Sequence, residues 1–435
     1  MFETDFLTPT HGAAYRDAVA KAVDTLLAAL PSRSYSGKSA DELAVLLESK
    51  ILPTNGTGIE EGLNRLRPLI ANSIVLTHPN TIAHLHCPPL IASLAAEVIV
   101  SALNQSMDSF DQAPAATVLE LAMSRWLCDE AGLPAGSDAI FTSGATQSNF
   151  MGLLLARDFC ISSRWQWSVQ RRGLPPQANR LRFLCSDVAH FTVEKSAAQL
   201  GLGTDAVIKV RVDDDYRMIP GELAKSLRRL KDNDLIPAAI VGTAGTTDFG
   251  SIDPLAEIAS LAREAGAWLH VDAAYGSALL LSRRHRDLLR GFDQADFPNL
   301  VNKSLSTTRR FDALKLWLSF QVLGREKFGQ MVDRTIGLAA HAAAFIRNSP
   351  ALELLHNPQY GCVVFRYRPA RDSDSDALNS ALRQKLFERG VAVIGHTRVR
   401  GRQCLKFTCM NPATSEKEIE DLLRQIVEQG RVIEN

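Results

Sequence analysis

Apolar and polar positions between residues 181 and 272 predict a repeated strand–helix unit. Short apolar runs predict strands at 181–186, 206–212, 238–243 and 267–272, and apolar residues at helical spacing predict a helix between successive strands. Alternation of this kind is typical of a mostly parallel sheet with right-handed crossovers and helices on its faces. The sequence therefore predicts an α/β fold with a mostly parallel central sheet.

The flanking regions follow other patterns. Amphipathic helices at 15–30 and 41–52 each end at a proline, and two such helices must pack on the main body or on a second subunit. After a long helix predicted at 311–346, the chain alternates strands and helices, which indicates a small α+β domain. We expect an N-terminal helical segment, a large α/β domain and a small C-terminal domain, with bounds at 1–80, 81–335 and 336–435.

Composition narrows the class of protein. The chain has 435 residues, with 48 basic and 48 acidic side chains, so no net charge directs it to nucleic acid or an anionic membrane. Seven scattered cysteines without CxxC spacing are typical of reduced thiols. The start resembles no secretory signal, and the longest apolar stretch, 88–103, contains Glu97 and is too short to span a bilayer. We expect a cytoplasmic protein that binds neither nucleic acid nor membrane.

Three polar side chains follow predicted strands. Asp272 ends the strand at 267–272, Thr246 follows the strand at 238–243, and His190 follows the strand at 181–186. Ligands of parallel α/β sheets bind at the carboxyl ends of the strands, so we expect these three side chains at one edge of one sheet. Taken alone, Asp272 would be an ordinary turn residue.

A small-residue turn precedes this unit. A short strand predicted at 139–141 runs into the turn 142–149, and a helix is expected at 150–157. Unpaired backbone N–H groups and the helix dipole make such a turn a site for an anion, and the hydroxyls of Ser143 and Thr146 can add donors. The turn matches neither GxxxxGK[ST] nor GxGxxG, which disfavours a nucleotide loop. The alternative is a simple helix N-cap.

Two further loops are candidates for the wall of a pocket. Residues 78–86 hold three histidines, but no carboxylate stands at ligand spacing, so we expect no metal site there. The polar stretch 103–114 includes Phe110 and Asp111, and it can be either a pocket wall or a solvated loop.

Together these parts suit one cofactor. A phosphate cradle, a flat ring between two side chains and a carboxylate that faces a ring nitrogen are what pyridoxal 5′-phosphate requires. The carboxylate keeps the nitrogen protonated, and the ring then accepts electrons from the substrate's Cα.

The chain resembles the group II pyridoxal-dependent amino-acid decarboxylases from about His78 to the C-terminus. The motifs that carry the resemblance are at 186–197, 270–276 and 309–317. Stretches 78–89 and 104–114 are most similar to bacterial diamino-acid decarboxylases, which act on 2,4-diaminobutyrate or lysine for siderophores or polyamines. The resemblance implies a fold-type I enzyme that is a homodimer with active sites at the interface.

The resemblance also implies roles for individual residues. Ala145 and Thr146, with Ser143, would hold the phosphate, and His190 and Ala274 would line the two faces of the ring. Asp272 would pair with the ring nitrogen, and Thr246 would neighbour the substrate. The remaining substrate contacts are expected from His78, Phe110 and Asp111, with a carboxylate at Asp108 or Asp111 for the distal ammonium of a diamino acid.

One departure is serious. The family links its cofactor to a lysine in a His-Lys pair, and this chain has no His-Lys pair. Asp296 passes directly into Phe297, where the family carries that Schiff-base lysine, a further strand and a mobile loop with a catalytic tyrosine. Three explanations are open. In the first, a segment is missing from the sequence because it was not visible in a crystal. In the second, the segment was deleted naturally, and in the third, Lys303 acts as the Schiff-base lysine. We favour the first.

Other functions fit the same residues. An aromatic-amino-acid decarboxylase, another pyridoxal-phosphate lyase or an aminotransferase would share the carboxylate and the phosphate cradle. If the junction of Asp296 and Phe297 is genuine, a non-catalytic relative that acts as a binding or structural partner is the alternative.

Overall fold

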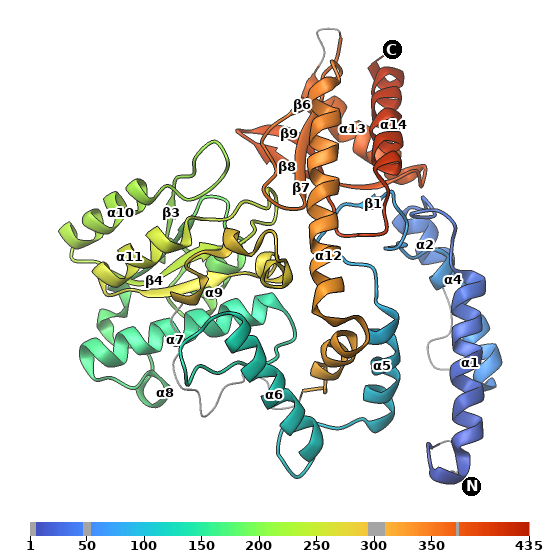
Figure 1. Ribbon diagram of the computed structural model, residues 1–435, viewed down its shortest axis with the longest axis horizontal. Coiled ribbons are helices and arrows are strands. Elements are labelled where there is room, and N and C mark those ends of the chain that lie inside the picture. The colour runs from blue at the N-terminus through green and yellow to red at the C-terminus, as the bar shows by residue number, and fades with distance from the viewer. Residues whose placement is uncertain (1–5, 47–53, 295–308, 371–373, 435) are drawn as a thin grey trace. The chain divides into compact units, whose positions relative to one another are not determined.

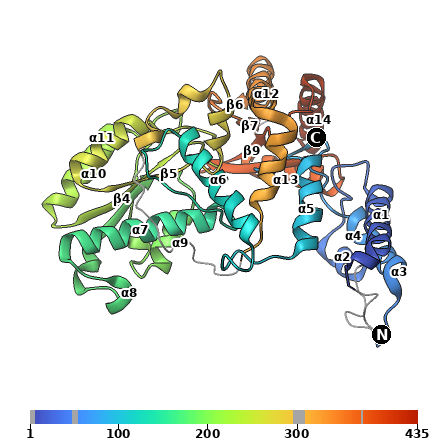
Figure 2. The ribbon, with the colours of Figure 1, turned by 60° about the horizontal axis from the view of Figure 1, so that its bottom comes forward.

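The structure is a computed structural model of the 435-residue chain, and the residues it describes are 6–46, 54–294, 309–370 and 374–434. The chain divides into two compact units. Unit 1 comprises Met1–Pro89, Ala340–Leu355 and Val363–Asn435, and unit 2 comprises Leu90–Ala339 and His356–Cys362. Figures 1 and 2 show the elements in the colours of the chain order.

Three sequence predictions fall outside the described residues. They are the end of the helix at 41–52, the junction of Asp296 with Phe297, and Lys303. Because the junction and Lys303 lie outside the described residues, the three explanations for the missing lysine all stay open.

Unit 2 is built on a four-stranded sheet. Its strands are β2 (Leu181–Ser186), β3 (Val207–Val210), β4 (Ile236–Thr243) and β5 (Trp268–Asp272). Every pairing is parallel, in the order β3-β2-β4-β5, and Thr243 is in register with Asp272. The predicted α/β fold with a parallel sheet is confirmed, and the ends of β4 and β5 lie at the same edge.

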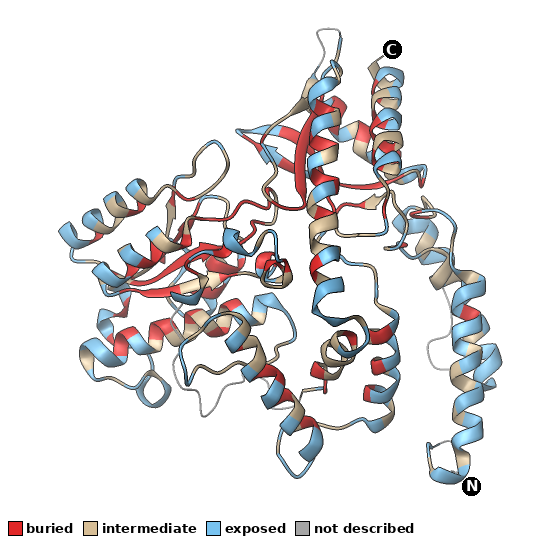
Figure 3. Ribbon diagram, in the orientation of Figure 1, coloured by how far each residue is buried: buried red, intermediate tan, exposed pale blue. Residues whose placement is uncertain are grey.

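Helices cover both faces of this sheet (Figures 1 and 3). On one face, α7 (Ala145–Trp165) and α9 (Thr192–Gln199) pack on Phe183 and Val241, and on the other, α10 (Pro220–Asp232) and α11 (Leu255–Ala265) pack on Leu184, Ile240 and Leu269. Neighbouring strand residues point to opposite faces, so a strand buried on both sides is apolar throughout. Each large apolar side chain buried in this way contributes about 1.5–3 kcal/mol.

A buried carboxylate ties the loop before α10 to the carboxyl end of β4. Asp253 accepts the backbone N–H groups of Met218 at 2.7 Å and Thr243 at 2.8 Å. Burial of the side chain raises the pKa of Asp253 to about 6. The two hydrogen bonds fix the loops that surround the end of β4.

The rest of unit 2 is helical and irregular. Its longer helices are α5 (Ile91–Leu103), α6 (Pro114–Glu130) and the start of α12 (Ala313–Asn348), which is interrupted at Gly324, and its short elements are α8 (Val169–Arg172) and the turns η3 to η7 (Pro176–Arg180, Thr204–Ala206, Gly276–Leu281, Arg286–Leu289 and Phe292–Gln294). The strand predicted at 139–141 is wrong. The carbonyl of Phe141 accepts a hydrogen bond from the Arg309 guanidinium at 3.1 Å. A side chain thus provides the hydrogen bond that a neighbouring strand would provide in a sheet.

Unit 1 holds a mixed sheet and the N-terminal helices. Its strands are β1 (Thr81–Ile82), β6 (Leu352–Leu354), β7 (Cys362–Tyr367), β8 (Val393–Val399) and β9 (Arg402–Thr408), in the order β1-β8-β9-β7-β6. Its helices are η2 (Pro9–His11), α1 (Gly12–Ala29), α2 (Ala40–Leu46), α3 (Gly58–Asn64), α4 (Arg67–Ala71), the end of α12, α13 (Ser375–Glu388) and α14 (Glu416–Glu434).

A tight turn joins two strands of unit 1. Strand β8 ends at Val399 and β9 begins at Arg402, and the two residues between them, Arg400 and Gly401, both have positive φ. Residues 393–399 alternate between buried and exposed over most of this length, so their polar side chains belong to the exposed side of a hairpin strand.

Candidate active site

A buried carboxylate stands at the carboxyl end of β5. Asp272 is 7% exposed, and each of its oxygens accepts one hydrogen bond. The backbone N–H of Ala274 donates to Oδ1 at 3.1 Å, and Asn149 Nδ2 donates to Oδ2 at 2.9 Å. An ionised carboxylate can accept further bonds, so Asp272 keeps capacity for one more donor.

The start of α7 lies one helical turn from this carboxylate. Ala145 and Thr146 are the first two residues of the helix, and Asn149, which bonds Asp272, follows one turn later. The first turn of a helix leaves backbone N–H groups without an intrahelical acceptor, and the dipole there favours an anion. The Ser143 hydroxyl already donates to Gln147 Oε1 at 2.8 Å within the turn.

His190 is tied to the same position through a threonine. Its Nδ1 lies 2.9 Å from Thr192 Oγ1, and Asn149 Nδ2 donates to that oxygen at 3.0 Å. Asn149 is 4% and Thr192 is 1% exposed, so the connection is shielded from water. His190 itself is half-buried, beyond the end of β2.

Thr246 occupies the loop after β4. It is fully buried, its N–H donates to the Ser251 carbonyl at 2.9 Å, and its hydroxyl accepts the Ser251 N–H at 3.1 Å. The N–H of Ala244 in the same loop donates to the Asp272 carbonyl at 2.8 Å. The loop that carries Thr246 is therefore hydrogen-bonded directly to the end of β5. Beyond Asp272, the side chain of Ala274 is exposed.

The structure connects the expected residues of unit 2 in three ways: through side-chain hydrogen bonds, through backbone hydrogen bonds and through a shared helix. His190 and Asp272 share Asn149, the Thr246 loop is bonded to the Asp272 backbone, and Ala145 and Thr146 begin the helix that carries Asn149.

The expected substrate residues make local hydrogen bonds. Phe110 and Asp111 are exposed between α5 and α6, and the Asp111 carboxylate accepts from Ser109 at 2.5 Å. His78 belongs to unit 1, where its Nδ1 accepts the Asn80 N–H at 3.0 Å. The roles of these three residues stay predictions.

Sequence reasoning missed three connecting residues. Asn149, Thr192 and His270 form the hydrogen bonds between the side chains that face the site, and His270 Nε2 lies 2.9 Å from Asn149 Oδ1. Burial lowers the pKa of His270, so the neutral ring is favoured. The available signal was spacing: Asn149 stands three residues after Thr146, on the same face of α7.

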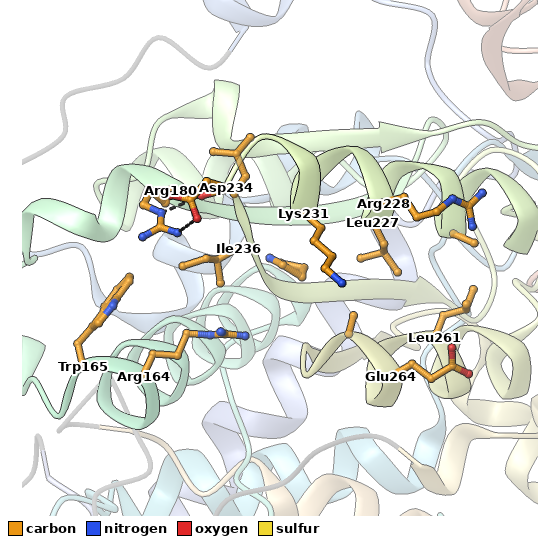
Figure 4. Close-up of a pocket in the computed structure, with 14 residues that line it drawn as sticks. Arg164, Trp165, Arg180, Leu227, Arg228, Lys231, Asp234, Ile236, Leu261 and Glu264 are labelled. Carbon is orange, nitrogen blue, oxygen red and sulfur yellow. Dashed lines mark hydrogen bonds and ion pairs between the residues drawn. The ribbon is translucent and has the colours of Figure 1, made fainter.

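A cleft of unit 2 lies at the other end of the sheet (Figure 4). About 840 Å³ in volume, it is lined by Ile236 at the start of β4 and by basic side chains that include Arg164, Arg228 and Lys231. The helices α7, α10 and α11 all end here. Basic residues complement the negative ends of helix dipoles, which accounts for these cations without a ligand.

No described helix is long and apolar enough to cross a membrane. Within the ranges that the structure describes, no group of three or more His, Cys, Asp or Glu side chains is placed to hold a metal ion.

Known proteins with the same architecture identify the family. The family model for the pyridoxal-dependent decarboxylase conserved domain matches residues 47–300 and 297–368. The L-2,4-diaminobutyrate decarboxylases of Acinetobacter baumannii and Rhizobium meliloti are each 37% identical to this chain; both alignments cover 97% of it, with 94% and 92% of the respective relative.

A solved structure agrees over nearly the whole chain. The glutamate decarboxylase domain of diaminobutyrate-pyruvate transaminase and L-2,4-diaminobutyrate decarboxylase from Vibrio parahaemolyticus has a TM-score of 0.94, with 38% identity and 99% of each chain covered. The two pieces of the family match meet at 297–300, where the sequence predicts a missing segment. With matches of this extent, the chain belongs to the pyridoxal-dependent decarboxylase family.

Proposed function

We propose that the chain holds pyridoxal 5′-phosphate, the cofactor of its family, at the carboxyl edge of β2, β4 and β5. There it removes the carboxylate of a diamino acid, with 2,4-diaminobutyrate the first choice and lysine the second. The observation that carries the proposal is the buried Asp272 carboxylate, which has one donor on each oxygen and capacity for one more.

The residues at this edge fit the cofactor. A protonated ring nitrogen is the donor that Asp272 lacks, and the first turn of α7 offers backbone N–H groups for the phosphate. Ala274 is small and exposed, and His190 is half-buried, so both are accessible to the faces of a flat ring. The buried Thr243 hydroxyl, in register with Asp272, has no hydrogen-bond partner in the described structure.

The family's linking lysine is the part that does not fit. Between Asp272 and Arg309 the sequence contains one lysine, Lys303, and it lies outside the described residues. In the family, the lysine that binds the cofactor covalently lies between the aspartate and the motif that begins here at Arg309. Lys303 is the lysine of this chain at that place in the order.

Each residue then has a physical task. When bound, the cofactor supplies an electron sink for the electron pair left at the substrate's Cα. Asp272 stabilises the proton on the ring nitrogen, because a buried carboxylate beside a cation favours the charged pair. His190 holds one face of the ring, and Thr246, in a loop fixed by Ser251, positions the substrate.

The experiment is a substrate panel on the full chain supplied with pyridoxal phosphate. We expect carbon dioxide from L-2,4-diaminobutyrate at a kcat/KM at least about tenfold above that for lysine, glutamate or an aromatic amino acid. A keto acid without carbon dioxide would instead indicate an aminotransferase, and a preference for an aromatic substrate would contradict the diamino-acid assignment.

A non-catalytic relative is the second candidate, favoured by the absence of a His-Lys pair. Borohydride reduction followed by peptide mass spectrometry separates the two. We expect the reduced cofactor on the peptide that contains Lys303. Bound cofactor with no modified lysine and no carbon dioxide from any substrate would support the non-catalytic alternative.

We expect Asp111→Asn to raise KM for 2,4-diaminobutyrate about tenfold, with a smaller fall in kcat. An ion pair with the distal ammonium would contribute about 1.4 kcal/mol, which is a factor of ten. Steady-state kinetics of carbon dioxide release measure the effect. A slow substrate without a distal ammonium is the control, and its KM should not change; an unaltered KM for the diamino acid would remove Asp111 from the substrate site.

The assembly and the cellular role complete the proposal. Apolar side chains are exposed on α1, where Leu27 is 66% exposed, and on α5, where Ile91 is 85% exposed. Such surfaces are typical of interfaces, so we propose a homodimer with the active site at the interface. Sedimentation of the full chain measures its mass. We further propose a cytoplasmic enzyme that supplies a diamine for siderophores or polyamines.

A further inference from the structure

One amide side chain forms hydrogen bonds with three side chains around the site. Asn149 Nδ2 donates to Asp272 Oδ2 at 2.9 Å and to Thr192 Oγ1 at 3.0 Å, and Asn149 Oδ1 lies 2.9 Å from His270 Nε2. Thr192 Oγ1 in turn lies 2.9 Å from His190 Nδ1. The two side chains proposed to hold the ring, Asp272 and His190, are thus connected through a single buried residue.

The orientation of the amide follows from its neighbours. An ionised carboxylate only accepts hydrogen bonds, so the NH2 group of Asn149 must face Asp272. Both of its hydrogens are then used, one for Asp272 and one for Thr192. The amide oxygen is left facing His270 Nε2, and because a carbonyl oxygen only accepts, His270 must carry its proton on Nε2.

The same logic assigns the proton of His190. Thr192 Oγ1 already accepts from Asn149, and its own hydrogen is available for His190 Nδ1. The backbone N–H of Thr192 also points at that nitrogen, at 3.4 Å. Two donors directed at Nδ1 require it to be unprotonated, so the proton of the neutral His190 ring lies on Nε2.

A glycine makes room for the far end of the network. A Cβ on Gly152 in α7 would lie 2.5 Å from His270 Nδ1 and 2.6 Å from His270 Cε1. The His270 imidazole therefore packs directly on the backbone of α7 at Gly152. This packing fixes the direction from which the ring reaches Asn149, one helical turn earlier.

We infer that Asn149 is a positioning residue that orients Asp272 and fixes His190 in its Nε2-protonated form through one directional chain of hydrogen bonds. The chain runs from His270 to Asn149, and from Asn149 both to Asp272 and through Thr192 to His190. The inference rests on the proposed function, because only that function assigns Asp272 and His190 to the cofactor ring. The hydrogen bonds themselves are present in the chain without a ligand.

The test uses nitrogen and proton NMR of the full chain labelled with ¹⁵N-histidine, first without cofactor. His190→Gln and His270→Gln identify the two sets of signals. We expect both rings at neutral pH to have an unprotonated Nδ1, and the His270 Nε2–H proton to be protected from exchange with water. A proton on Nδ1 of either ring would overturn the inference, and this result needs no variant at position 149.

The variant Asn149→Ala then tests the coupling. We expect the His270 Nε2–H signal to exchange with water and disappear, the His190 nitrogen shifts to move, and the dissociation constant of pyridoxal phosphate to rise about tenfold. Asn233→Ala, an exposed asparagine at the end of α10, is the matched control. Unchanged histidine signals in folded Asn149→Ala would overturn the inference, whereas a chain that binds no cofactor but shows these signals would contradict only the proposed function.

Discussion

Asp272→Asn is expected to weaken pyridoxal phosphate binding and to slow carbon dioxide release, each by a factor of about 10²–10⁴. Removing one partner of a buried ion pair costs about 3–5 kcal/mol, and each 1.4 kcal/mol is a factor of ten. The asparagine keeps the size of the side chain, but its NH2 group would face either the Asn149 Nδ2 or the ring nitrogen, and both are donors.

Equilibrium titration with pyridoxal phosphate and steady-state kinetics measure the two effects. Asp205→Asn is the matched control, because Asp205 is exposed and precedes β3 at the opposite edge of the sheet. We expect the control to bind and turn over as the natural chain does. Equal cofactor affinity in both variants would mean that Asp272 does not face the ring.

Gly276→Ala is expected to destabilise the fold by about 1–3 kcal/mol or more, with a fall in Tm of several degrees. A Cβ at this position would lie 2.2 Å from the Ala244 carbonyl oxygen and 2.8 Å from its carbon. Both atoms are backbone and cannot rotate away. The Gly276 N–H donates to that same carbonyl at 2.9 Å, so the substitution would separate the loop after β5 from the loop that carries Thr246.

Thermal unfolding followed by circular dichroism measures this change. Gly221→Ala in the first turn of α10 is the control, because a Cβ there has nothing within 4 Å. We expect it to leave Tm unchanged or slightly raised, since alanine favours a helix over glycine. A Tm for Gly276→Ala equal to that of Gly221→Ala would contradict the close approach of the two loops.

Periodicity was sufficient for the strands of unit 2. Leu181–Ser186 and Trp268–Asp272 are mostly apolar because helices cover both faces of their sheet, and such runs are read directly from the sequence. The expected strand at 139–141 looks equally apolar, yet its Phe141 carbonyl is bonded to Arg309, a residue 168 positions later. A contact at that distance leaves no local signal.

The candidate site likewise contains residues that the sequence could predict and residues that it could not. Asp272 stands at an element end, where the sequence pattern changes, so its position was predictable. The helix expected at 150–157 instead begins at Ala145, within the turn predicted at 142–149. Asn149 and His270 lie inside elements, where a polar residue has no distinct pattern. Their meeting depends on the packing of α7 on β5 and on the missing side chain of Gly152, which only the fold reveals.

The most direct measurement is the ¹⁵N NMR spectrum of pyridoxal phosphate labelled at the ring nitrogen and bound to the full chain. We predict a protonated nitrogen at neutral pH in the natural chain and an unprotonated one in Asp272→Asn. A nitrogen that is unprotonated in both, or protonated equally in both, would contradict the claim that the buried carboxylate at the end of β5 holds the cofactor ring.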